Sequence, residues 1–433
     1  MSADLEGVDR GTRVEHDPHT AAGVLDRCEL LNRFSAHPTR LERVYLSPQH
    51  RAANDAVDDW MRYIGMSTWV DAAGNQWGRF EGREPGLPAL VLGSHLDTVP
   101  DAGSYDGMLG VTMALAVAER LMGQVHTLPF ALEIVGFSDE EGTRFGKALL
   151  GSSAAAGLWD EDWWDLRDQQ GTTLLEAFRQ WGLDPRRVDE AARRPEDVVA
   201  YLEAHIEQGP YLEAADASLG FVTTIAGARR FVLSIIGEAR HAGGTPYERR
   251  KDALVGASLA ITQIEHLARE AGVIATCGQI NVLPGGVNVI PGRADFSLDL
   301  RHPSDEERDA MWATYVQVIG DICAERGLRF DWVETHAAPA MPCAPWLQNC
   351  VIEGIKVTAD EDPTAAAPMD LWSRAGHDGM AFGHVAEIGM LFVRCFDGIS
   401  HHPGEDVREI DVARGLDAFT EAVLAVARRV DAG

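Results

Sequence analysis

One short stretch places metal-binding side chains at the end of an apolar segment. His95 and Asp97 follow the apolar run 87–93, and Asp106 comes nine residues after Asp97. Residues two apart in an extended chain project to the same side, so His95 and Asp97 are expected to face one pocket. An imidazole that binds a metal while a carboxylate fixes its other ring nitrogen is a common arrangement. Taken alone, a His-x-Asp pair is also typical of a surface turn. The choice between a surface turn and a metal site therefore depends on the other candidate residues.

Further candidates stand at the ends of two other apolar segments. Residues 128–137 have the pattern of a buried strand that leads to Glu140 and Glu141, and 198–210 contain a strand that delivers His205. Neighbouring residues of an extended chain point in opposite directions, so one glutamate is expected to bind metal while the other faces substrate. In an α/β protein, ligands bind where such strands end. The pattern therefore predicts that these side chains share one sheet edge.

The segments between these strands have helical patterns. Asp106 is followed by Gly107 and an apolar helix over 111–118, and another helix is expected to begin at Pro48 behind the N-cap Ser47. The buried stripe of this second helix is predicted to be Ala53, Val57, Trp60 and Ile64. Strands buried on both faces, with helices between them, indicate an α/β fold with a largely parallel sheet.

The pattern changes after about residue 220. A β-α-β-β-α-β order, which is that of a ferredoxin-like unit, is predicted for strands 231–237, 273–283, 293–300 and 328–334 and helices 249–271 and 304–326. In the second helix, a capping box begins at Ser304, and Met311, Tyr315, Val318 and Ile322 are expected to face inward. The chain is therefore divided into a catalytic domain of residues 1–220 and 337–433 and an inserted α+β domain of residues 221–336.

Composition narrows the classes of partner. A length of 433 residues favours two domains, and a formal charge of −29 argues against nucleic acid or an anionic membrane as a partner. An anionic substrate would need locally placed arginines. The six cysteines show no C-x-x-C spacing, which indicates reduced thiols rather than disulfides or a zinc knuckle.

Membrane and export signals are not expected. No apolar run approaches the roughly 20 residues that a membrane helix needs. Residues Met1–Glu6 have neither a basic leader nor an apolar core. A cytoplasmic location is therefore predicted by default.

Together, these motifs resemble a known series of metal-site residues. The residues His95-x-Asp97, Asp106, Glu140-Glu141, His205 and Ser400-His401 are similar, in this order, to the site of the M20 metallopeptidase superfamily. The closest resemblance is to its allantoate amidohydrolase and N-carbamoyl-L-amino acid amidohydrolase branch, also called the hydantoinase/carbamoylase family. The motifs specific to this branch are 203–210 and 241–246, and the motifs 288–292 and 298–301 add to the match. The resemblance runs from about Leu46 to the end of the chain.

The resemblance implies a mixed-sheet hydrolase domain with two divalent metal ions. His95 and His205 would hold one ion, Glu141 and His401 the other, and Asp106 would bridge them. Nitrogen and oxygen ligands suit Zn²⁺, Mn²⁺ or similar ions, and the sequence does not choose between them. His402 is an alternative to His401, since it adds a second imidazole beside the expected ligand.

The same resemblance implies catalytic roles. Glu140 would be the general base, and Asp97 would orient His95. His241 would stabilise the oxyanion. His377, which the resemblance leaves without a role, is expected either to touch substrate or to make a structural hydrogen bond.

The resemblance also implies how substrate is held. His241 would contact it together with Gln208, Arg230, Asn288 and Arg301. Two arginines suit the capture of a carboxylate by forked hydrogen bonds, although each also fits an ordinary surface salt bridge. The inserted domain would be a lid and dimerisation domain, which implies a homodimer. Gly244 and Tyr247 depart from the Thr and Met common in the lid motif, so its contribution to specificity is open.

The leading functional hypothesis is hydrolysis of a small anionic ureido acid, with allantoate first, releasing ammonia and CO₂. The alternative is an N-carbamoyl-L-amino acid amidohydrolase or a β-ureidopropionase-like enzyme. An M20 dipeptidase or aminoacylase is disfavoured, because His205 stands where peptidases usually carry a carboxylate. A metal-poor binding protein should have lost a ligand or the base, and none is missing.

Overall fold

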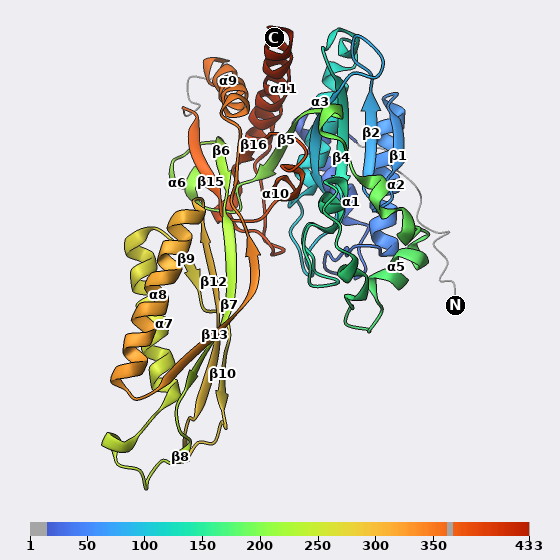
Figure 1. The fold of residues 1–433 in the computed structure, drawn as a ribbon. Coiled ribbons are helices and arrows are strands. Elements are labelled where there is room, and N and C mark those ends of the chain that lie inside the picture. The colour runs from blue at the N-terminus through green and yellow to red at the C-terminus, as the bar shows by residue number, and fades with distance from the viewer. Residues whose placement is uncertain (1–14, 362–366, 433) are drawn as a thin grey trace. The chain divides into compact units, whose positions relative to one another are not determined.

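The computed structural model describes residues 15–361 and 367–432 and divides into two compact units (Figure 1). The first unit comprises Met1–Thr223, Cys343–Leu371 and Gly376–Gly433, and the second comprises Thr224–Pro342 and Trp372–Ala375. The segment Met1–Glu6, on which the predicted location rests, lies outside the described residues. The lid and dimerisation roles of the inserted domain stay predictions.

A mixed sheet forms the centre of the first unit. Within the described residues this sheet has nine strands, in the order β1-β2-β4-β3-β5-β16-β6-β14, and β15 also pairs with β6. The strands are β1 (Ser67–Val70), β2 (Gln76–Phe80), β3 (Ala89–His95), β4 (Ala131–Phe137), β5 (Val198–Ile206), β6 (Leu219–Ile225), β14 (Met341–Pro342), β15 (Met369–Ser373) and β16 (Ile388–Val393). The four strands β4, β3, β5 and β16 run parallel. Their carboxyl ends therefore meet at one edge, as predicted.

Helices cover this sheet. They are α1 (Ala21–Asn32), α2 (Pro48–Tyr63), α3 (Met108–Leu121), α4 (Leu150–Ala155), α5 (Leu174–Trp181), α6 (Tyr211–Ala214), α9 (Pro345–Glu361), α10 (Gly379–Phe382) and α11 (Glu409–Ala432). Every residue of β3 and β4 is buried, which explains their continuous apolar pattern. Ser47 caps α2, and the predicted stripe of that helix is buried, so both predictions are confirmed. No helix in the described part of the chain is long and apolar enough to span a membrane.

The second unit has the predicted ferredoxin-like order. Its strands are β7 (Gly227–Ile236), β8 (Arg240–His241), β9 (Ile274–Thr276), β10 (Ile280–Leu283), β11 (Val289–Ile290), β12 (Arg293–His302) and β13 (Arg329–Ala338). They form a sheet of order β10-β12-β7-β13, with β9 beside β12 and a separate β8–β11 pair. Helices α7 (Ala253–Ala271) and α8 (Asp305–Glu325) pack on this sheet around one apolar core (Figure 1).

One local prediction in this unit is only partly confirmed. Tyr315 is buried and Met311 packs against the core, as predicted, but the other buried residues of α8 are Arg308, Trp312, Ile319 and Cys323 in place of Val318 and Ile322. Trp312 stacks on Phe231 at 3.7 Å between ring centroids, and this pair fixes the rotation of the helix. β13 continues to Ala338, past the predicted end of the inserted domain at residue 336, and Met341–Pro342 form β14.

Candidate metal centre

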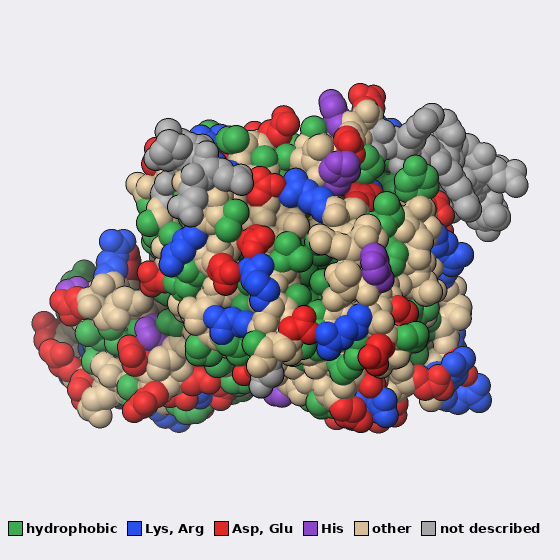
Figure 2. All heavy atoms as spheres, turned by 90° about the horizontal axis from the view of Figure 1, so that it is seen from above, with side chains coloured by type: hydrophobic (Ala, Val, Ile, Leu, Met, Phe, Trp, Pro, Cys, Tyr) green, Lys and Arg blue, Asp and Glu red, His purple; other side chains and the backbone are tan. Residues whose placement is uncertain are grey.

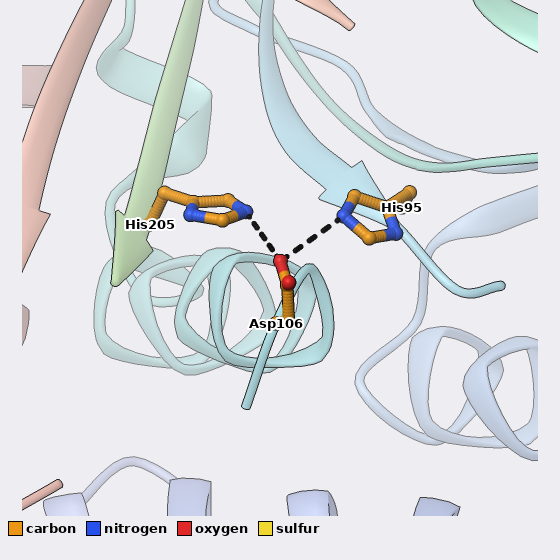
Figure 3. A group of neighbouring side chains, drawn as sticks. All are labelled: His95, Asp106 and His205. Atoms are coloured by element: carbon orange, nitrogen blue, oxygen red, sulfur yellow. Dashed lines mark ion pairs between the residues drawn. The ribbon is translucent and has the colours of Figure 1, made fainter. Parts of the chain in front are cut away.

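The site begins where neighbouring parallel strands end. His95 is the last residue of β3, His205 lies near the end of β5, and Asp106 precedes α3. Asp106 Oδ1 lies 3.6 Å from His95 Nε2 and 3.2 Å from His205 Nε2 (Figure 3). Two ligands about 2.1 Å from one tetrahedral ion lie about 3.4 Å apart. The spacing of these three atoms therefore suits a divalent cation between them.

The second oxygen of Asp106 faces a different pair of side chains. Its Oδ2 lies 3.1 Å from His401 Nε2, which in turn lies 3.3 Å from Glu141 Oε1. The ligand atoms of Asp106, Glu141 and His401 all lie within 4.8 Å of one another, as do those of Asp106, His95 and His205. Asp106 thus belongs to two groups through opposite oxygens, which is what a bridging ligand requires.

Backbone carbonyls fix which imidazole nitrogens face Asp106. His95 Nδ1 lies 3.1 Å from the Asp97 carbonyl oxygen, and His205 Nδ1 lies 2.9 Å from the Ile206 carbonyl oxygen. A carbonyl only accepts, so each Nδ1 carries the proton and each Nε2 presents a lone pair. The Asp106 carboxylate also only accepts. Acceptors that converge in this way fit a bound cation.

The electrostatics favour positive charge here. Burial lowers the pKa of His95, but its contact with Asp106 and the charges of Glu140 and Asp97 raise that pKa well above its usual value. Contact with Asp106 raises the pKa of His401 to about 9. Burial raises the pKa of Asp106, but the three histidines hold it well below its usual range. A cluster that retains protons so strongly also attracts metal cations.

Gly107 allows Asp106 to approach His95. Gly107 has φ +72°, and a Cβ at this position would lie 2.5 Å from three atoms of the His95 ring. Any other residue would push the imidazole away or reshape the start of α3. The Asp-Gly sequence is therefore part of the geometry of the site.

The two adjacent glutamates converge instead of pointing in opposite directions, while their separate roles stay predictions. Ligand atoms of His95, Glu140 and Glu141 all lie within 4.8 Å of one another, so both carboxylates reach the same pocket. The expectation of opposite directions assumed an extended chain, whereas β4 ends at Phe137 and both glutamates lie in the loop after it. The Asp97 carboxylate accepts from the Glu140 and Glu141 backbone N–H groups at 3.0 and 3.2 Å. It lies 3.7 Å from His95 Nδ1, so the carbonyl of Asp97 makes the closer contact with that ring.

Several supporting residues had no predicted role or a different one. Gln208 Nε2 donates to Asp106 Oδ2 at 2.9 Å, so this predicted substrate residue contacts the bridging carboxylate. Ser400 Oγ donates to the same oxygen at 3.0 Å and lies 2.9 Å from Glu405 Oε2. Glu405 Oε1 accepts from the backbone N–H groups of Tyr105 and Asp106. The role of Glu405 was missed, because nothing in the sequence pairs residues 300 positions apart.

The structure distinguishes His401 from His402, the two candidates for one metal ligand, and places His377. His402 is exposed, and its Nδ1 accepts from the Gly404 N–H at 3.0 Å. It belongs to none of the candidate metal groups formed by described residues, so the geometry favours His401. His377 is buried with its ring 4.5 Å from that of His205, and burial holds its pKa well below the usual value.

A model of the peptidase family M20/M25/M40 matches residues 91–425. This chain belongs to that family. The chain is 38% identical to the N-carbamoyl-L-amino acid amidohydrolase of Geobacillus stearothermophilus, over 89% of this chain and 93% of the relative. It is 35% identical to a probable allantoate deiminase of Oryza sativa subsp. japonica, over 90% and 85% of the two chains.

A solved structure extends this agreement to the fold. A hydantoinase/carbamoylase family amidase from Burkholderia multivorans superposes with a TM-score of 0.85 at 30% identity, covering 96% of this chain and 99% of that one. The predicted family and fold class are confirmed. This M20 family member is a hydrolase of linear amide C–N bonds.

The substrate residues predicted in the second unit fall into two pairs. Arg230 Nε and Arg301 Nε donate to opposite oxygens of Asp299, at 2.8 and 2.7 Å. His241 and Asn288 lie at the β8–β11 pair, where the Ala242 N–H donates to the Asn288 carbonyl. Their roles in binding stay predictions.

Proposed function

We propose that this M20 family hydrolase cleaves the carbamoyl C–N bond of small ureido acids, with allantoate as the first candidate substrate. N-carbamoyl-L-amino acids, or β-ureidopropionase-like substrates, are the alternative. Relatives named for both reactions match nearly the whole chain at similar identity. The observation that carries the proposal is the placement of Asp106 between two groups, one of which contains His205 rather than a second carboxylate.

The residues present fit two divalent ions, Zn²⁺ or Mn²⁺. His95 and His205 would hold one, Glu141 and His401 the other, and Asp106 both. Such ions, when bound, polarise the carbonyl under attack and lower the pKa of water. Gln208 and Ser400 support this arrangement by donating to Asp106 Oδ2, which keeps the carboxylate oriented.

Glu140 is suited to move the proton. Burial, together with the charges of Glu141 and Asp378, raises the pKa of Glu140 well above its usual value. A carboxylate with a raised pKa is a stronger base once it is ionised. Glu140 accepts a proton from the attacking water and returns it to the leaving nitrogen. Asp97 positions Glu140 through the 3.0 Å bond from its backbone N–H.

Arg230 and Arg301 are suited to bind a carboxylate. Both guanidinium groups share the single carboxylate of Asp299, so the trio carries a net charge of +1. The Arg230 side chain is 50% exposed and keeps donors available. In a chain with a formal charge of −29, this local excess gives an anionic substrate a place to bind.

The position of the second pair of predicted substrate residues, His241 and Asn288, supports a homodimer. Arg230 lies six residues before the end of β7, a span of about 20 Å, and His241 lies beyond that end. One small ligand therefore cannot contact both pairs within a single second unit. If both act on one substrate, His241 and Asn288 must come from another copy of the chain.

A cytoplasmic location is part of the same proposal. All six cysteines are free thiols, and five of them are buried. Free thiols suit a reducing compartment.

A substrate panel tests the proposed function. The metal-loaded protein is incubated with allantoate, several N-carbamoyl-L-amino acids, 3-ureidopropionate and a set of dipeptides, while ammonia and free amine are measured. We expect ammonia from one class of ureido acid and no dipeptide cleavage. Turnover of dipeptides alone would replace the proposal with the peptidase alternative.

A further inference from the structure

A pocket in the first unit has no candidate metal ligand in its lining. Its volume is about 620 Å³, within the range of small-molecule sites. Its lining comes from four parts of the chain: residues 42–51, Pro100 in the loop after β3, residues 143–144, and the segment 168–181. The last of these had no predicted function. None of the proposed metal or substrate residues lines the pocket.

The charged residues of this pocket differ in their partners. Four lining residues are charged: Glu42, Arg51, Arg144 and Asp168. Glu42 pairs with Arg40 at 3.3 Å. Arg144 pairs with Asp168 at 3.2 Å.

Asp168 is further satisfied by the backbone. Its Oδ1 accepts from the N–H groups of Gln170 and Thr172 at 3.0 and 2.9 Å. Its negative charge is therefore already committed to donors of the protein. The four charged lining residues carry no net charge together, but among the described residues Arg51 is the one that makes no ion pair, so its guanidinium is available to an anion.

Trp181 orients this arginine. The Arg51 Cζ lies 3.9 Å from the centroid of the Trp181 ring, and Arg51 Nη2 donates to the Trp181 carbonyl. A guanidinium held on an indole keeps its remaining N–H donors for a planar anion, which favours a carboxylate bound by two hydrogen bonds. The stacked pair thus supplies a preoriented anion contact.

Three amide side chains complete the polar lining. Gln169, Gln170 and Gln180 all face this pocket. A primary amide offers both a donor and an acceptor, so it pairs with another amide or a ureido group. We propose that the pocket between α2 and α5 is an accessory binding site for a small carboxylate that also carries an amide group, with Arg51 as its anion contact.

The site is tested by ¹⁹F NMR on the metal-loaded full chain labelled with 5-fluorotryptophan. The Trp181 resonance is assigned as the one that a Trp181→Phe variant lacks. Titration with succinamate, which is not a ureido acid, should shift this resonance saturably. Butyrate lacks the amide of succinamate, succinamide lacks its carboxylate, and sulfate is an inorganic anion. Each of the three should bind more weakly than succinamate.

Variants locate the binding. Arg51→Gln should raise the Kd for succinamate about tenfold or more, as expected for a lost charge-assisted contact. Gln180→Glu, an exposed change that adds negative charge to the pocket, should also weaken binding. Arg62→Gln, on the same helix but outside the lining, should leave the Kd within about twofold. The proposal is overturned if the Trp181 resonance does not respond, if sulfate binds as well as succinamate, or if Arg51→Gln binds like the unmodified protein.

Discussion

At the scale of single residues, the metal site depends on Gly107, which has no Cβ and so leaves room for the His95 ring. Gly107→Ala is expected to reduce metal content and cut activity by orders of magnitude, because its Cβ would lie 2.5 Å from the His95 ring. The φ of +72° adds a strain of about 1–3 kcal/mol. Metal analysis and the melting temperature measure the two effects. Gly123→Ala is the control, since a Cβ there meets nothing within 4 Å. Equal metal content in both variants would contradict the role of Gly107.

His50 provides a pH test of stability away from the metals. Burial lowers the pKa of His50 to about 3. Its unfolded value is near 6.5, so below that pH the unfolded chain takes up a proton that the folded protein excludes. Stability should therefore fall as the pH drops from about 6.5 towards 3, by up to about 1.4 kcal/mol per pH unit.

The variant His50→Gln isolates this contribution. It loses the titrating group, so its unfolding free energy should depend less steeply on pH over the same window, whatever its absolute stability. Denaturant unfolding at several pH values between 7 and 4 gives both slopes. Parallel curves for the two proteins would show that His50 does not contribute.

At this scale the sequence predicted residue types better than contacts. His95, Asp106, His205 and His401 could be found because their motifs stand at the ends of apolar runs. The direction of Glu140 and Glu141 could not, because both lie in the loop after β4, where the alternation of an extended strand no longer holds. The contact of Glu405 with Asp106 also could not, because a distant loop makes it.

At the scale of elements, the loop after β16 fixes the start of α3. The Glu405 carboxylate accepts from the Asp106 N–H at 3.1 Å, and its other oxygen lies 2.9 Å from Ser400 Oγ. Glu405→Gln replaces one acceptor oxygen by a donor, so metal affinity or activity is expected to fall about 10–100-fold. Metal titration and kinetics of the variant measure this loss.

Glu409→Gln is the matched control for that change. Glu409 is exposed in the first turn of α11, so its substitution should alter neither metal affinity nor rate. If both variants behave like the unmodified enzyme, Glu405 does not position Asp106.

Element order was easier to predict than element orientation. The β-α-β-β-α-β order of the second unit followed from periodicity and capping residues such as Ser304. The full buried face of α8 did not, because Met311 and Trp312 are both apolar, and the stacking of Trp312 on Phe231 accompanies the deeper burial of Trp312. Such a choice is made by tertiary packing, which single-chain periodicity does not contain.

At the scale of the whole molecule, the chain is strongly acidic. On the face that Figure 2 shows, basic side chains are interspersed among the acidic ones. The formal charge of −29 therefore acts as a general repulsion of anions, and binding of an anionic substrate depends on local groups such as Arg230 and Arg301.

Shared sites in a homodimer can be tested by complementation. Glu140→Ala and His241→Ala chains should each be inactive, and their refolded equimolar mixture should regain about a quarter of the activity if each site uses both chains. Refolded mixtures of each variant with itself are the controls. No recovery in a mixture shown to contain mixed dimers would place Glu140 and His241 in one chain's site.

The central claim is that five side chains hold two cations on either side of one carboxylate. Anomalous diffraction from crystals of the Mn²⁺- or Zn²⁺-loaded protein measures this directly. We predict two peaks about 4 Å apart, one beside His95 and His205 and one beside Glu141 and His401, with Asp106 between them. A single peak, or peaks that Asp106 does not touch, would contradict the claim.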